Sequence, residues 1–121
     1  MIVCAIDDLM FSVKISTAAK SLQADVYFER TPGRVLETVR EKQPSLIIFD
    51  LNSARMQPMD TIAALKADPV LKAIRTLGYV SHVDSDTIDK ARAAGIDEVL
   101  ARSAFAGRLG EILSEPETPA T

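Results

Sequence analysis

The chain has 121 residues, of which 47% are hydrophobic and 26% charged, and its formal net charge is -3. This length predicts a single domain that buries a sizeable core, and the slight acidic excess argues against a nucleic-acid-binding surface, because such surfaces are basic. No apolar stretch approaches the roughly 20 residues of a membrane span, and Asp7 and Asp8 interrupt the apolar start too early for a signal peptide. We therefore expect a cytoplasmic domain that binds neither nucleic acid nor membrane.

Five short stretches predict the strands of a sheet; four are apolar runs, and the alternating residues 26–28 predict a short, more exposed strand. The first runs into Asp7 and contains the only cysteine, Cys4, which we expect to be an inert core thiol. The stretch SLIIFDLN, residues 45–52, is the clearest, because four consecutive apolar residues lead directly into Asp50. In chain order, the predicted strands are residues 1–6, 26–28, 46–50, 77–81 and 99–101.

Between these strands, apolar residues recur with the spacing of one helix face. Thr31 and Pro32 are typical of a helix start, and Gly95 is well placed to cap the end of a helix. The acidic, proline-containing residues 115–121 predict a disordered tail after a domain of residues 1–114. The predicted helices cover residues 11–22, 32–39, 59–68, 84–94 and 105–113.

Strand and helix thus alternate five times along the chain. This alternation predicts an α/β fold of the flavodoxin-like, doubly wound type: a parallel sheet in the order 2-1-3-4-5 between two layers of helices. Ligands of such sheets bind beyond the carboxyl ends of the strands. A functional site is therefore expected where the strands end.

Polar residues follow the strands at that edge. Carboxylates brought together there repel one another and raise their pKa values unless a cation compensates them, and oxygen ligands of this kind suit Mg²⁺. A carboxylate, a hydroxyl and a fixed cation around a metal are the groups needed to receive a phosphoryl group. The residues are Asp7 and Asp8 after the first strand, Asp50 at the third, Ser81 and His82 after the fourth, and Arg102 and Ser103 after the fifth.

This pattern resembles the receiver (CheY-like) domain of two-component response regulators over residues 1–113. The resemblance implies that Asp50 accepts phosphate and that Ser81 and Arg102 bind the acyl phosphate. It also implies a weakly bound Mg²⁺, bridged by Asp8, Asp50 and the backbone carbonyl of Asn52, with Asp7 holding waters of the metal.

The resemblance further implies a role without enzymatic turnover, in phosphorelay signalling. The phosphoryl donor would be a histidine kinase or a phosphotransfer protein, and a downstream protein target would read the phosphorylated state through surface contacts.

The sequence departs from the family at three places. Arg102 and Ser103 replace the usual lysine and proline, and Val99 replaces a switching aromatic residue. The guanidinium fork of Arg102 either lies bidentate on Asp50 and competes with phosphate, or binds phosphate itself. The loop NSARMQPMD after the third strand is also longer than usual and lacks glycine. These departures leave a second hypothesis open, a pseudo-receiver that binds proteins without being phosphorylated.

Three other classes of function fit less well. A phosphatase with an aspartate nucleophile needs a second carboxylate two residues on, where Asn52 stands. A nucleotide-binding module needs a glycine-rich turn after the first strand, which is absent. A cobalamin-binding domain needs a histidine ligand in a glycine-flanked loop, and His82 lacks that setting. We interpret His82 as a surface loop residue that could border the phosphate site and titrate near neutrality.

Overall fold

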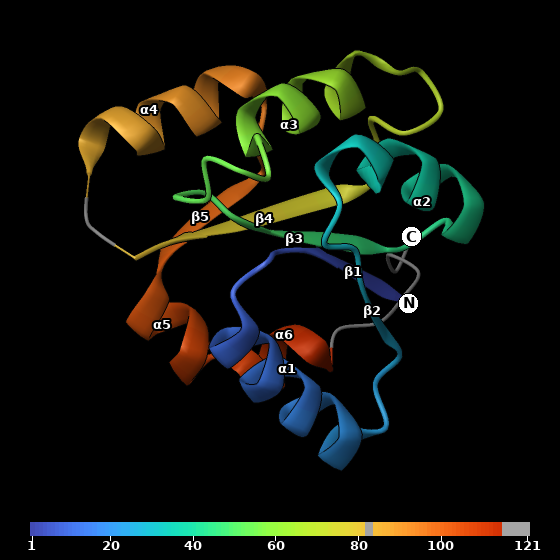
Figure 1. Ribbon diagram of the computed structural model, residues 1–121, viewed down its shortest axis with the longest axis vertical. Coiled ribbons are helices and arrows are strands. Elements are labelled where there is room, and N and C mark those ends of the chain that lie inside the picture. The colour runs from blue at the N-terminus through green and yellow to red at the C-terminus, as the bar shows by residue number, and fades with distance from the viewer. Residues whose placement is uncertain (82–83, 115–121) are drawn as a thin grey trace.

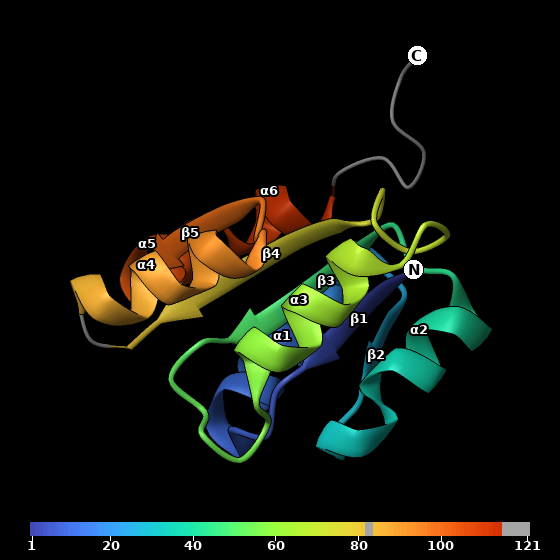
Figure 2. The same cartoon turned by 90° about the horizontal axis from the view of Figure 1, so that it is seen from above.

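The computed structural model describes residues 1–81 and 84–114. A parallel five-stranded sheet in the order β2-β1-β3-β4-β5 lies between two helical layers, with α1, α5 and α6 on one face and α2, α3 and α4 on the other (Figures 1 and 2). The predicted fold class and strand order are therefore confirmed. The strands are β1 (Ile2–Ala5), β2 (Val26–Phe28), β3 (Leu46–Asp50), β4 (Arg75–Val80) and β5 (Glu98–Ala101); the helices are α1 (Leu9–Leu22), α2 (Val35–Lys42), α3 (Pro58–Ala67), α4 (Ser85–Ala94), α5 (Arg102–Gly107) and α6 (Leu109–Leu113), and a 3₁₀ turn, η1 (Pro32–Arg34), precedes α2.

Two apolar cores, one on each face of the sheet, hold these layers together. Every residue of β1 and β3 is buried, because strand side chains alternate between the faces and both faces are covered. Cys4 and Ile48 pack toward α1, whereas Val3 and Ile47 pack toward α2 and α3. Burial raises the pKa of the Cys4 thiol far above its usual range, as expected of an inert core thiol.

Helix ends follow local signals that the sequence carries. The Asp8 carboxylate accepts the backbone N–H of Phe11 at 3.1 Å and so caps the start of α1. Gly95 ends α4 at a φ of 104°, as predicted, because glycine adopts this left-handed conformation without steric cost. Asp8 is thereby held in place by its role in the helix as well as by its position after β1.

The prediction of a single last helix over residues 105–113 is wrong. The structure has two short helices there, α5 and α6, with a break at Arg108. Gly107 favours the break because glycine is a poor helix former, and Arg108 leaves the helical conformation with a φ of −103° and a ψ of 9°. The first of these helices begins at Arg102, directly after β5, so the start of α5 places this side chain at the carboxyl edge of the sheet.

Two predictions fall outside the described residues, those for His82 and for the tail over 115–121. Among the residues that are described, no helix is both long and apolar enough to cross a membrane.

Candidate functional site

Asp50 ends the central strand β3 and is the centre of the candidate site. Asp50 is only 8% exposed, and it lies opposite Tyr79 of β4 in the register of the two strands. Burial raises the pKa of the Asp50 carboxyl, a hydrogen bond from the Asn52 N–H at 3.0 Å opposes this shift, and the charges of Asp8 and Asp7 raise the pKa further. The charges of Asp8 and Asp7 thus act on Asp50 in the direction that like-charge repulsion predicts, although burial has the larger effect.

Asp8 is paired with Arg102. While one oxygen of Asp8 caps α1, the other accepts a hydrogen bond from Nη2 of Arg102 at 3.0 Å. The same guanidinium lies over the Phe11 ring, with 4.6 Å from its carbon to the ring centroid. The suggestion that Arg102 lies on Asp50 is thus wrong for this structure, because the aromatic face of α1 directs the guanidinium to the carboxylate beside it.

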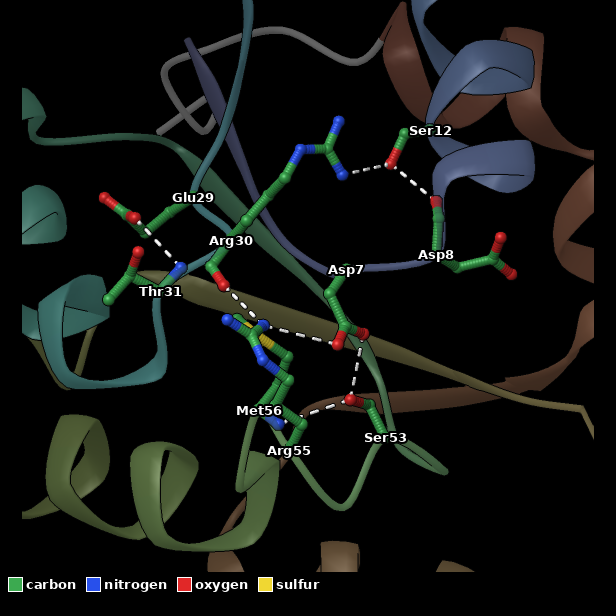
Figure 3. Close-up of polar contacts among 9 residues, drawn as sticks. All are labelled: Asp7, Asp8, Ser12, Glu29, Arg30, Thr31, Ser53, Arg55 and Met56. Carbon is green, nitrogen blue, oxygen red and sulfur yellow. Dashed lines mark hydrogen bonds and ion pairs between the residues drawn. The ribbon is translucent and has the colours of Figure 1, made fainter.

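Asp7 is engaged from the loop between β3 and α3. It accepts a hydrogen bond from Ser53 Oγ at 3.0 Å, and one of its oxygens lies 3.4 Å from Nη1 of Arg55 (Figure 3). The same Nη1 donates a hydrogen bond to the Arg30 carbonyl at 2.7 Å. The buried side chain of Met56 anchors this loop to the core. Ser53 and Arg55 were missed from the sequence, although both belong to the unusually long loop that the sequence already marked.

A second set of contacts joins the loop after β2 to α1. Nη1 of Arg30 donates to Ser12 Oγ at 3.0 Å, and that hydroxyl donates to the Asp8 backbone carbonyl at 2.7 Å (Figure 3). The two arginines, Arg30 and Arg55, thereby connect the loops after β1, β2 and β3. The acidic edge is built as one network rather than as separate loops.

Asn52 and Ser81 connect the ends of β3 and β4. The side-chain oxygen of Asn52 accepts the Ser81 N–H at 2.6 Å, while its own N–H binds Asp50. Ser81 is exposed at the edge of the sheet. Val99 of β5 is partly buried and packs against the core on the α3 and α4 face, so it does not reach this edge.

Tyr79 is an unexpected member of the site. Its ring is fully buried between Phe11 and Phe105, with centroid distances of 4.8 and 5.0 Å. Burial, followed by the charges of Asp50 and Asp8, raises the pKa of the Tyr79 hydroxyl far above its ordinary value. Within residues 1–81 and 84–114 this hydroxyl has no hydrogen-bond partner. No sequence signal separated Tyr79 from an ordinary core aromatic.

A pocket of about 620 Å³ opens beside these residues, between α1 and the start of α5. Two of the residues predicted to bind phosphate, Ser81 and Arg102, face it, together with Ser103. Lys14 adds a second positive charge, and Met10 and Phe11 supply an apolar wall. The pocket therefore combines hydroxyls and cations at the ends of β4 and β5, a composition suited to an anionic group.

The arrangement does not fit a divalent metal. Among the described residues, no three or more His, Cys, Asp or Glu side chains are grouped so that they could hold a metal ion. Asp7 and Asp8 each already have a guanidinium partner, Arg55 and Arg102. The Mg²⁺ predicted from the sequence stays a prediction.

Comparison with known proteins identifies the fold. No family model matches the chain, and no curated protein matches it in sequence. Among solved structures, it is similar to the Mn²⁺-bound form of response regulator Rcp1 (TM-score 0.80, 18% identity, 98% of each chain covered). It is also similar to the phosphorylated cyanobacterial phytochrome response regulator RcpA (0.77, 22%, 93% of this chain and 86% of that one) and to a response regulator from Hahella chejuensis (0.83, 18%, 93% and 91%). The chain has the fold of response regulator receiver domains.

Proposed function

We propose that this domain is a receiver in phosphorelay signalling, in which Asp50 accepts a phosphoryl group from a phosphohistidine of a histidine kinase or phosphotransfer protein. The observation that carries the proposal is the position of the buried Asp50 at the carboxyl end of the central strand, where Asn52 links it to Ser81. That one of the similar structures is of a phosphorylated response regulator supports the same role. The domain would act in the cytoplasm and would signal to a downstream protein rather than catalyse turnover.

In the proposed step, a carboxylate oxygen of Asp50 attacks the phosphorus in line with its bond to the imidazole nitrogen. The oxygen–phosphorus bond forms while the nitrogen–phosphorus bond breaks, and the imidazole leaves with the electron pair and takes up a proton. The Asn52 N–H holds one oxygen of Asp50 at 3.0 Å, which orients the other toward the donor. We assign Ser81 and Arg102 to the phosphoryl oxygens, because both follow strands at the same edge of the sheet as Asp50 and line one pocket there.

The proposed step uses only groups of the protein and of the phosphohistidine. The set expected from the sequence was Asp7, Asp8, Asp50 and the Asn52 carbonyl, but the aspartates after β1 are bound to arginines in the structure. Rcp1 was solved in a Mn²⁺-bound form, which supports divalent-cation binding by a protein of the same fold.

Intact-mass analysis after incubation with acetyl phosphate tests the proposal, with and without Mg²⁺. Wild type is expected to gain one phosphoryl group and Asp50→Asn none. Asp25→Asn is the matched control, because Asp25 is an exposed carboxylate that precedes β2, at the opposite, amino edge of the parallel sheet. If wild type gains no more mass than Asp50→Asn under either condition, phosphoryl acceptance is refuted.

The second candidate is a pseudo-receiver that binds its partner without phosphorylation. The observation in its favour is that Asp7 and Asp8 are already neutralised by Arg55 and Arg102. For a pseudo-receiver, Asp50→Asn would leave partner binding unchanged, whereas a phosphoacceptor would lose the phosphorylation-dependent part of that binding.

A further inference from the structure

The two carboxylates after β1 are compensated by arginines from distant parts of the chain. Arg102 is 94 residues from Asp8 and Arg55 is 48 residues from Asp7, so the fold itself brings each pair together. The N···O distances are 3.0 and 3.4 Å. This edge of the sheet thus carries its own counter-charges.

Both side chains of the Asp8–Arg102 pair are held by further contacts. Asp8 is fixed because its second oxygen caps α1 through the Phe11 N–H. Arg102 is fixed because it begins α5 and its guanidinium lies against the Phe11 ring. A guanidinium held in this way loses little further freedom when it binds the carboxylate, which strengthens the contact relative to a mobile surface pair.

The second pair is held from the loop between β3 and α3. Arg55 donates a hydrogen bond to the Arg30 carbonyl at 2.7 Å and also pairs with one oxygen of Asp7. The Ser53 hydroxyl donates to the other oxygen of Asp7 at 3.0 Å (Figure 3). The buried Met56 next to Arg55 keeps the loop close to the sheet. Both oxygens of Asp7 therefore have partners from one short segment.

We infer that Arg55 and Arg102 supply from within the chain the positive charge that a divalent metal would supply at Asp7 and Asp8, and that such a metal binds there only by displacing them. The folded domain then needs no metal, and its affinity for Mg²⁺ is weak. Removing either arginine frees a carboxylate and strengthens Mg²⁺ binding. This inference concerns the cation alone and does not depend on phosphoryl transfer.

Titration of Mg²⁺ into the ¹⁵N-labelled domain at constant ionic strength tests the inference. The observable is the dissociation constant from amide shifts of Asp7, Asp8 and Asn52. Arg55→Gln and Arg102→Gln are each expected to bind Mg²⁺ about fivefold more tightly than wild type, a size typical of one partly exposed ion pair, and the double variant is expected to exceed both. The melting temperature of wild type is expected to be the same in EDTA and in Mg²⁺.

Two control variants separate competition from general effects. Arg40→Gln removes the same charge from an equivalent pair, Arg40 with Asp68 at 2.9 Å between α2 and the end of α3, and is expected to leave Mg²⁺ affinity unchanged. Arg102→Lys keeps the charge and is expected to stay close to wild type.

The inference is overturned if neither glutamine variant binds Mg²⁺ more tightly than wild type, including the case in which none binds it. It is also overturned if Arg40→Gln or Arg102→Lys tightens binding as much as Arg102→Gln does. Circular dichroism checks folding; should Arg102→Gln fail to fold, Arg55→Gln, in an exposed part of its loop, carries the same comparison.

Discussion

Replacing Tyr79 by phenylalanine is expected to stabilise the domain. The Tyr79 ring packs between Phe11 and Phe105, and phenylalanine keeps these contacts. The substitution removes only a buried hydroxyl that has no partner among the described residues. Burying a polar group without a hydrogen bond is unfavourable, so its removal lowers the free energy of the folded state relative to the unfolded one.

The size of the gain follows from two opposing contributions. An unsatisfied buried polar group costs about 1–3 kcal/mol. Loss of one oxygen atom leaves a void of roughly 15 Å³, which costs about 0.4 kcal/mol. The net gain is therefore about 0.6–2.6 kcal/mol, which for a chain of 121 residues raises the melting temperature by roughly 2–10 °C.

Urea denaturation of wild type and Tyr79→Phe, followed by circular dichroism, measures this gain as a higher midpoint at unchanged slope. Tyr27→Phe is the matched control, because Tyr27 is 39% exposed and is not enclosed in the core as Tyr79 is. The free energy of unfolding is expected to change by no more than about 0.5 kcal/mol there. A destabilised Tyr79→Phe would refute the reasoning and show that the hydroxyl has a partner beyond the described residues, such as water.

Three further predictions concern the same strands. Asp50→Asn is expected to raise the melting temperature at pH 7.5: the folded pKa of Asp50 lies above its unfolded value, so the protonated form is favoured in the folded state and the ionised form opposes folding. The gain should shrink as pH falls through the folded pKa and vanish below the unfolded value of about 3.9; a gain independent of pH would contradict it. Gly78→Ala is expected to cost about 1–3 kcal/mol in urea denaturation, because its new Cβ would lie 2.6 Å from buried Leu51 side-chain atoms, and an unchanged midpoint would show that Leu51 moves aside cheaply. Thr76→Val is expected to cost about 1–3 kcal/mol, because the Thr76 hydroxyl both donates to the Asp97 carboxylate and accepts the Asp97 N–H, each at 3.0 Å; a neutral effect in the same assay would mean that water replaces it.

Local patterns were enough to predict the fold and the centre of the site. Strands buried on both faces of a parallel sheet need continuous apolar runs, and such runs mark β1 and β3. The alternation of strands and helices then predicted a doubly wound parallel sheet, because parallel neighbours require crossover connections, and the order 2-1-3-4-5 is confirmed. Asp50 could be placed at the carboxyl edge because it directly follows one of these runs.

The partners of the site residues were decided only by the tertiary structure. The cation that pairs with each carboxylate after β1 is the one that the packing of loops and helices brings close to it. The spacing of residues along the sequence does not give these distances in space. Asp50 or a bound phosphate was the partner considered for Arg102, yet the ring of Phe11 and the start of α5 bring it to Asp8. Arg55 reaches Asp7 because the loop between β3 and α3 lies against the loop after β1. The sequence by itself determined where charge gathers; packing decided which charges meet, because ion pairs depend on distances of a few ångströms between segments far apart in the chain.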